Sequence, residues 1–123
     1  MSAEPRPPRL RMRIVFGDIG MMGPGKAELL ERIDRTGSIA AAGREMNMSY
    51  KRAWTLIETL NAMFRQPVVE SARGGPGVGG AHLTETGRAV LRHYRAFEAA
   101  ARQAGAAEIA AIQRLTRDIP DGE

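Results

Sequence analysis

Two helical segments separated by a two-residue turn lie within residues 38–64, and they restrict the fold more than any other feature. Ser38 and Ser49 are each suited to begin a helix, because a serine hydroxyl accepts a hydrogen bond from a free backbone N–H group of the first turn. Asn47-Met48 forms the turn between the segments. The first segment is short and rich in alanine, which lets neighbouring helices approach closely. We therefore predict two helices packed together around a tight turn.

The second segment, from Ser49 to about Phe64, has two different faces. Apolar residues recur at the spacing of one helical face, namely Ala53, Ile57, Leu60 and Phe64. The opposite face is polar and partly basic, with Lys51, Arg52, Thr55 and Thr59. Pro67 ends the segment. The pattern predicts a helix whose inner face is anchored in a core and whose outer face is cationic.

The residues before this pair predict a tail, a strand and a further helix. Residues 1–10 contain Pro5, Pro7 and Pro8 and are expected to be disordered. Four arginines, Arg6, Arg9, Arg11 and Arg13, make this lead-in a basic arm, which either is simply solvated or makes weak phosphate contacts. Residues 11–19 have a strand-like pattern that the glycines from Gly20 to Gly25 end. A helix with Leu29, Leu30 and Ile33 then ends at Gly37.

The residues after the pair predict a hairpin and a long helix. Strands at 68–72 and 81–83 flank the loop 73–80, which contains five glycines and one proline, so the hairpin has a flexible tip. Thr84 begins a helix that reaches about Thr116 and would be roughly 45 Å long at 1.5 Å per residue. Gly105 is expected to weaken or bend it. Residues 117–123 are predicted to be a frayed tail.

Composition excludes several classes of protein. The 123 residues suffice for one domain, and 43% are hydrophobic, which is enough for a core. The absence of cysteine excludes disulfides, thiolate metal sites and cysteine nucleophiles. No apolar run approaches the roughly 20 residues that span a membrane, and the N-terminus lacks a signal-peptide core. We therefore expect a cytoplasmic, nucleoid-associated protein with no membrane partner.

Catalytic and cofactor chemistry has little support in the sequence. His82 and His93 lack the spacing of metal ligands, and no Ser/His/Asp arrangement is suggested. The glycine-rich loop is followed by no Lys-Ser or Lys-Thr pair and lies between strands, so it does not match a phosphate-binding P-loop. We expect no metal, no cofactor and no enzyme activity. A nucleotide-processing enzyme remains a third hypothesis that only the glycine loop suggests.

The order strand, helix, helix, turn, helix, hairpin and long helix is that of a winged helix-turn-helix. The major groove of DNA is about 12 Å wide and admits one helix, which needs a polar outer face and an apolar inner face. Residues 49–64 have both faces, and the net charge of +4 suits a polyanionic partner. We predict a mainly α fold with a small β-hairpin wing, comprising a DNA-binding domain at 11–83 and a dimerisation helix at 84–116.

Specific motifs strengthen this interpretation. They are Gly37-Ser38-Ile39, Met48-Ser49-Tyr50-Lys51, Ala53-Trp54, Leu60-Asn61, Arg73-Gly74-Gly75, Gly77, Gly79-Gly80-Ala81, Leu83-Thr84 and Gly87. In these motifs the chain resembles the N-terminal DNA-binding domain of the molybdate-responsive ModE regulators, and more loosely the LysR-type winged helix, over about residues 11–100. The resemblance implies a dimer formed through the first and last helices and a roughly palindromic operator.

The resemblance and the residue pattern together select candidate sites. The candidate DNA-binding residues are Ser38, Ser49, Tyr50, Lys51, Arg52, Thr55, Arg73, Gly74 and Gly75. The candidate dimerisation residues are Leu91, Tyr94, Phe97, Ala101, Ile109 and Ile112. Full-length ModE regulators carry a C-terminal molybdate-binding region, and too few residues follow the long helix here for another domain. We therefore do not expect molybdate binding.

Several alternatives stay open at the level of sequence. Tyr50 either contacts phosphate or covers the edge of the core, and Trp54 either packs between helices, which its position favours, or faces DNA. The last helix either pairs with a second copy in a homodimer or folds back on its own domain. The leading hypothesis is a dimeric regulator that binds double-stranded DNA. The second is a protein-interaction module that forms a heterodimer with a full-length regulator.

Overall fold

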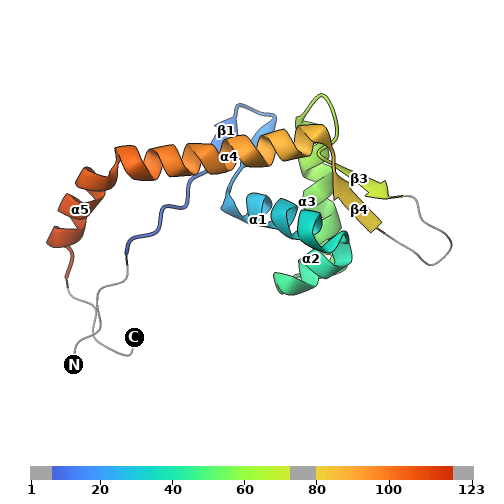
Figure 1. The fold of residues 1–123 in the computed structure, drawn as a ribbon, viewed down its shortest axis with the longest axis horizontal. Helices are drawn as coiled ribbons and strands as arrows, with labels where there is room; N and C mark the ends of the chain where they lie inside the picture. The colour runs from blue at the N-terminus through green and yellow to red at the C-terminus, as the bar shows by residue number, and fades with distance from the viewer. Residues whose placement is uncertain (1–6, 73–79, 118–123) are drawn as a thin grey trace.

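A computed structural model describes residues 7–72 and 80–117 of the chain. Within these residues the chain is mainly helical and has two small antiparallel sheets (Figure 1). The elements are β1 (Ile14–Phe16), β2 (Gly20–Met22), α1 (Pro24–Thr36), α2 (Ile39–Glu45), α3 (Tyr50–Met63), β3 (Val69–Ala72), β4 (Gly80–Leu83), α4 (Glu85–Ala104) and α5 (Ala106–Leu115). The predicted winged helix-turn-helix, with its small β-hairpin, is confirmed.

Helix α4 runs along one side of the molecule, with α1 beneath it, while the β3–β4 hairpin projects at one end and α5 lies at the other (Figure 1). Two ion pairs connect α4 to α1. Arg95 Nη2 lies 2.6 Å from Glu31 Oε1, and Arg88 Nη1 lies 2.8 Å from Asp34 Oδ1. Helix α3 and the hairpin lie together at the end of the molecule away from α5 (Figure 1).

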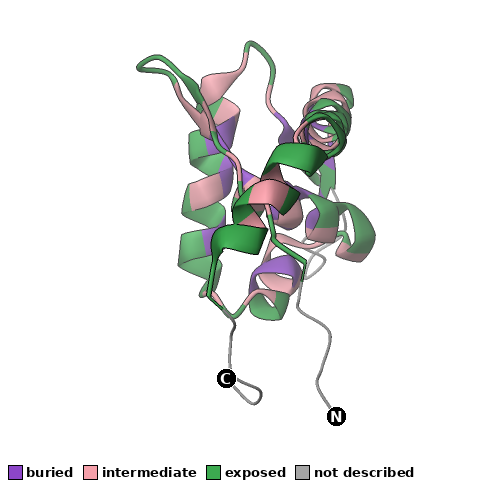
Figure 2. Ribbon diagram, turned by 90° about the vertical axis from the view of Figure 1, so that its left-hand side faces the viewer, coloured by how far each residue is buried: buried purple, intermediate pink, exposed green. Residues whose placement is uncertain are grey.

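The core lies where α1, α3 and the base of the hairpin meet. Its largest fully buried side chains are Leu29, Leu30, Ile33, Leu60, Val68 and Leu83. Figure 2 shows buried residues on the inner sides of the helices and exposed residues on the outer sides. Burying aliphatic side chains of this size contributes about 1.5–3 kcal/mol each to folding, so this small aliphatic core suffices to position the helices although the chain has few aromatic residues.

Side-chain caps fix the starts of three helices, as predicted. The Oγ of Ser38 accepts a hydrogen bond from the N–H of Ala41 at 3.0 Å. The Oγ of Ser49 accepts one from the N–H of Arg52 at 3.1 Å, and Thr84 Oγ1 accepts one from Gly87 at 3.0 Å. Asn47, in the turn between α2 and α3, has a φ of 59°, a left-handed conformation that asparagine tolerates.

The N-terminal region differs from the prediction. Of the strand expected at 11–19, only the residues of β1 form a strand. The glycine region that was expected to end it contains a second strand, β2. The two strands pair antiparallel with Ile14 opposite Met22 and Phe16 opposite Gly20. Gly17 has a φ of 54° in the tight turn that joins them. Gly17, which the prediction placed inside the strand, therefore reverses the chain, because it adopts a backbone conformation that other residues rarely adopt.

The last helical region, predicted at 84–116 with a weak point or bend at Gly105, is interrupted at that residue. Helix α4 ends at Ala104, and Gly105, with φ −93° and ψ 2°, separates it from α5. The axes of α4 and α5 point in different directions (Figure 1). The region therefore changes direction at Gly105, as predicted, although the N–H of Gly105 still donates to the carbonyl oxygen of Ala101 and its carbonyl oxygen accepts from the N–H of Ile109, each at 2.9 Å. Because the two helices are not collinear, the expected straight length of roughly 45 Å is wrong. Residues 1–6 and 118–123, which include most of the predicted arm and tail, lie outside the described residues.

Candidate nucleic-acid interface

The outer face of α3 is open to solvent. Lys51, Arg52 and Thr55 are exposed, as is the capping residue Ser49. Tyr50 is 57% exposed and Trp54 is 45% exposed. Both aromatic side chains therefore offer surface beside the cations. Of the two alternatives left open for Trp54, partial exposure supports the outward-facing one, since α2 approaches α3 on the side of Ala53.

The opposite face of α3 is anchored tightly. Ala53 and Leu60 are completely buried, and Ile57 is 2% exposed. Helix α2 packs so closely that a methyl group on Gly43 would lie 3.0 Å from the Cβ of Ala53. Because one side of α3 is fixed in this way, the cationic side has a defined direction and projects from a rigid support.

Asn61 fixes the hairpin relative to α3. Its Oδ1 accepts hydrogen bonds from the N–H groups of Val68 at 2.7 Å and Val69 at 3.1 Å. Its Nδ2 donates to the carbonyl oxygen of Val69 at 3.1 Å. One side chain near the end of α3 thus holds the first residues of the hairpin, which makes the helix and the wing a single unit.

Thr84 closes the other side of the hairpin base. Its Oγ1 donates to the carbonyl oxygen of Pro67 at 2.6 Å, and its N–H donates to the carbonyl oxygen of Val68 at 3.0 Å. In β3–β4, Val69 lies opposite Leu83 and Glu70 opposite His82. His82 Nε2 is 3.7 Å from Glu70 Oε2, so the histidine faces a carboxylate across the hairpin. Arg73, Gly74 and Gly75 lie outside the described residues and stay predictions.

The charges of the described residues are distributed unequally. On the side of α1 and α2, Arg32 and Arg35 both pair with Glu45, and Arg32 also pairs with Glu28. The Arg35 and Arg32 guanidinium groups lower the pKa of Glu45. Among the residues that the structure describes, Lys51 and Arg52 have no ion-pair partner. The first turn of α3 therefore presents two cations that remain available to an anion.

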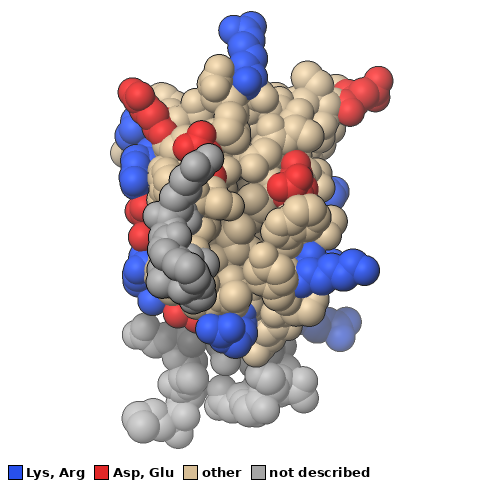
Figure 3. All heavy atoms as spheres, turned by 90° about the vertical axis from the view of Figure 1, so that its right-hand side faces the viewer, with Lys and Arg blue, Asp and Glu red and all other residues tan. Residues whose placement is uncertain are grey.

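A space-filling view from the hairpin end agrees with this distribution (Figure 3). On its right-hand edge, Lys and Arg atoms project from the lower half, whereas Asp and Glu atoms lie higher. Ser49, Lys51, Arg52, Thr55 and Leu56 line a shallow hollow of about 300 Å³. The structure therefore brings four of the predicted DNA-binding residues together in one place, with Tyr50 next to them in the chain.

Ser38 and Tyr94 lie elsewhere. Ser38 is half-buried at the start of α2, where its hydroxyl caps that helix, and it does not line the hollow. Tyr94, predicted as a dimerisation residue, is 3% exposed, and its hydroxyl donates to the carbonyl oxygen of Met12 at 2.6 Å. The sequence interpretation of Tyr94 needs correction, because the N-terminal segment of the same chain covers its side chain. Phe97 and Ile112 are exposed, at 38% and 62%.

Sequence reasoning missed part of the polar surface near α3. Arg11 and Arg13 were assigned only to a basic arm, and Lys26 was not selected, yet all three line a cavity with Arg52. The i, i+4 spacing of Tyr50 and Trp54 was a signal that both aromatic rings share one face of the helix. Among the described residues, no helix combines the length and apolar character needed to cross a membrane.

Comparison with known proteins places this geometry in a family. The family described as bacterial regulatory helix-turn-helix proteins of the lysR family matches residues 25–88. The molybdenum-pterin-binding protein MopA of Rhodobacter capsulatus is 46% identical over 79 residues, covering 64% of this chain and 30% of MopA. The molybdenum transport protein ModE of Azotobacter vinelandii is 40% identical over 82 residues, covering 66% of this chain and 30% of that protein.

A third relative bears a more explicit name. The DNA-binding transcriptional dual regulator ModE of Escherichia coli K12 is 38% identical over 71 residues, covering 58% of this chain and 27% of that protein. The chain thus spans less than a third of the length of these relatives. The matched family region runs from the start of α1 to the first turn of α4 and includes α2, α3 and the hairpin base. By this match, the chain belongs to the LysR family of bacterial regulatory helix-turn-helix proteins.

Proposed function

We propose that this chain is a sequence-specific DNA-binding transcriptional regulator that inserts α3 into the major groove. The observation that carries the proposal is the exposed first turn of α3, where Lys51 and Arg52 have no ion-pair partner among the described residues, beside a projecting hairpin. The names of the ModE relatives support the same conclusion, because one of them is a DNA-binding transcriptional regulator.

Each part of this surface has a distinct task in the proposal. The N-terminal residues of a recognition helix are the ones that reach base edges, so Arg52 and Thr55 read bases while Ser49 and Lys51 contact the phosphates beside them. A good bidentate contact to a base discriminates by roughly 1–3 kcal/mol. Phosphate contacts supply much of the remaining affinity and make it strongly salt-dependent. The hairpin follows the neighbouring DNA backbone, and Arg73, which lies outside the described residues, stays a predicted contact of the wing.

We propose further that two copies bind a palindromic operator. Exposed apolar side chains remain on the surface of the isolated chain at Val15, Phe16, Ile19, Phe97, Ile112 and Leu115. They lie on the β1–β2 hairpin and on α4 and α5. In the proposed dimer a second copy covers these side chains, and the two recognition helices lie in successive major grooves, roughly 34–36 Å apart.

Replacing Arg52 by alanine tests the DNA-binding proposal. The operator is first selected from fragments of the organism's own DNA, and affinity is then measured by fluorescence anisotropy at fixed salt. We expect R52A to weaken binding about 5- to 150-fold, which corresponds to roughly 1–3 kcal/mol. The matched control is R102A, because Arg102 is also exposed but lies on α4. Unchanged affinity of a folded R52A variant would contradict the assignment.

The same apolar surface supports a second function, a protein-interaction module that pairs with a longer regulator of the same family. Helix α5 contains no buried residue, and Leu115 is 86% exposed, so α5 offers a surface for another chain. Two measurements separate the functions: fragment selection with the isolated chain, and co-purification with a ModE-type protein. Failure to select any DNA, together with stable co-purification, would favour the interaction module.

A further inference from the structure

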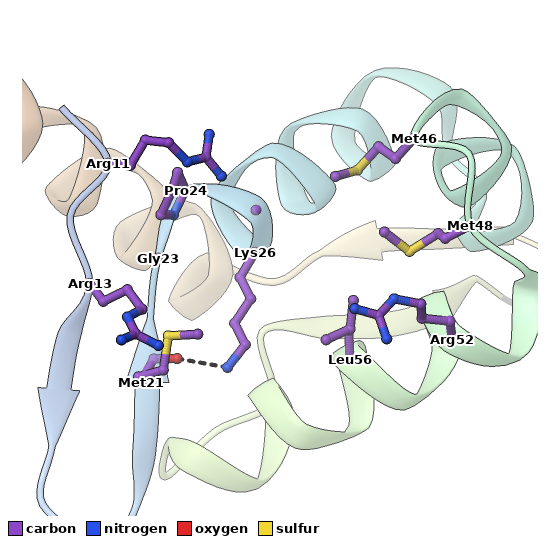
Figure 4. Close-up of a pocket in the computed structure, with 11 residues that line it drawn as sticks. Arg11, Arg13, Met21, Gly23, Pro24, Lys26, Met46, Met48, Arg52 and Leu56 are labelled. Carbon is purple, nitrogen blue, oxygen red and sulfur yellow. Dashed lines mark hydrogen bonds between the residues drawn. The ribbon is translucent and has the colours of Figure 1, made fainter. Parts of the chain in front are cut away.

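A cavity of about 420 Å³ lies beside the first turns of α3. It is bounded by the segment leading into β1, by the start of α1 and by the turn between α2 and α3 (Figure 4). Four cationic residues from three separate parts of the chain line it: Arg11, Arg13, Lys26 and Arg52. Among the described residues, no carboxylate lines this cavity. Four like charges around one space make it strongly attractive to an anion.

Among the described residues these cations have no counterion, and the side chains of Arg11, Arg13 and Arg52 are exposed to solvent. In the part of the chain that the structure describes, no hydrogen bond or ion pair engages the guanidinium groups of Arg11, Arg13 and Arg52. Lys26 Nζ donates to the carbonyl oxygen of Met21 at 2.8 Å, a bond drawn in Figure 4. Burial lowers the pKa of Lys26. A partly dehydrated ammonium group is stabilised when an anion supplies the missing opposite charge.

The remaining walls of the cavity are apolar and adaptable. Met21, Met46, Met48 and Leu56 contribute to them. Methionine side chains are flexible and polarizable, and they adjust to ligands of different shape. A volume in this range, with apolar walls and a few convergent polar groups, is typical of small-molecule sites. An inorganic anion alone would leave these apolar walls without contacts.

We propose that this cavity binds a small organic anion, in which a carboxylate, sulfonate or phosphate group pairs with cations that line the cavity and a compact apolar body contacts the methionines. Arg52 connects the cavity to the DNA-binding surface, because it lines both the cavity and the hollow on the outer face of α3. A bound anion would hold the Arg52 guanidinium in the cavity and add negative charge close to the DNA phosphates. It would therefore weaken DNA binding, a consequence that rests on the proposed function.

Binding is tested first on DNA-free protein, so that a failure of the DNA proposal is distinguishable from a failure of this one. The probe is 8-anilinonaphthalene-1-sulfonate, a sulfonate on an apolar body, titrated by fluorescence. Its neutral analogue, N-phenyl-1-naphthylamine, reports on apolar contacts alone. We expect saturable binding of the sulfonate that weakens at least about tenfold in R11Q/R13Q, since hydrogen bonds to charged groups contribute on this scale. We expect weaker binding of the neutral probe, with no dependence on these arginines.

The matched control is R102Q/R114Q, which removes the same charge from exposed positions on α4 and α5. Circular dichroism establishes that all variants are folded. Equal affinity of the sulfonate for R11Q/R13Q and the wild type, or an equal loss in the control, overturns the proposal. So does displacement of the probe by inorganic phosphate at equal concentration, because the apolar walls would then contribute nothing.

Methionine methyl groups locate the bound probe independently. In protein labelled with ¹³C at these methyls, the resonances of Met21, Met46 and Met48 are expected to shift on titration with the sulfonate. Met63, at the end of α3, does not line the cavity and serves as the internal reference. Shifts that spare the three lining methionines would place the probe elsewhere and refute the site. If they shift but operator affinity stays constant with saturating probe, the site stands and its coupling to DNA is refuted.

Discussion

Replacement of Gly87 by alanine provides a sharp test of how the hairpin base meets α4. A methyl group at this position would lie 2.1 Å from the carbonyl oxygen of Val68 and 2.9 Å from its carbonyl carbon. These are backbone atoms and cannot rotate away. The same carbonyl oxygen accepts the N–H of Thr84 at 3.0 Å, immediately before α4 begins. An alanine therefore has to push the start of α4 away from the hairpin.

The change in the free energy of unfolding has three contributions, two destabilising and one stabilising. Forcing extra volume into a packed site costs typically 1–3 kcal/mol. Weakening the hydrogen bond from Thr84 costs about 0.5–1.5 kcal/mol more. Alanine recovers roughly 1 kcal/mol because it favours the helix more than glycine does. We expect G87A to lower the free energy of unfolding by about 2 kcal/mol and the Tm by roughly 8 °C.

Urea unfolding, followed by far-UV circular dichroism at one fixed protein concentration, measures this change. The matched control is G25A in α1, where a methyl group would meet no atom within 4 Å. That variant is expected to be as stable as the wild type or slightly more stable. If G87A and G25A had equal midpoints, the close approach of α4 to the hairpin base would not exist in solution.

Two other side chains give predictions of their own. N61A leaves the N–H groups of Val68 and Val69 without their acceptor and should lower the free energy of unfolding by about 2–3 kcal/mol; a midpoint equal to that of the wild type in urea would refute the bridging role. Y94F removes the hydrogen bond to Met12 while keeping the ring, and should cost about 1 kcal/mol. Burial raises the pKa of Tyr94, so its contribution is present below the ordinary tyrosine pKa of about 10 and is lost at higher pH. Y94F should therefore show a smaller alkaline loss of stability, and an unchanged pH profile would contradict this.

The helix starts could be predicted from the sequence because capping is a local interaction. Ser38, Ser49 and Thr84 each accept a hydrogen bond from an N–H group three residues later, so a short stretch of sequence contains the whole motif. The orientation of α3 could be predicted for a similar reason, since a helical repeat determines which residues share a face. From these two local rules the sequence predicts that Lys51 and Arg52 are exposed on α3, and they are.

The sequence-based predictions were wrong where contacts with a distant segment of the chain determine the local structure. Strand β2 is short and begins at Gly20, whose surroundings include Met63 at the far end of α3. Tyr94 lies on the apolar stripe of α4, but a segment 82 residues earlier covers it. Periodicity identifies an apolar face and does not reveal whether the same chain or another one covers that face.

The cavity beside α3 could not be predicted for the same reason. Its cations come from positions 11, 13, 26 and 52, which no sequence motif connects. Only the packing of the N-terminal segment and the start of α1 next to α3 brings them together.

The break at Gly105 has a consequence for how the end of the chain acquires its structure. Helix α5 has 10 residues, none of them buried, whereas isolated helices shorter than about 12–15 residues are marginal in water. Separation from α4 also removes the cooperative support that a continuous helix would give it. We therefore expect the helicity of this segment to rise when another molecule packs against it, so that a dependence of helicity on protein concentration would report association.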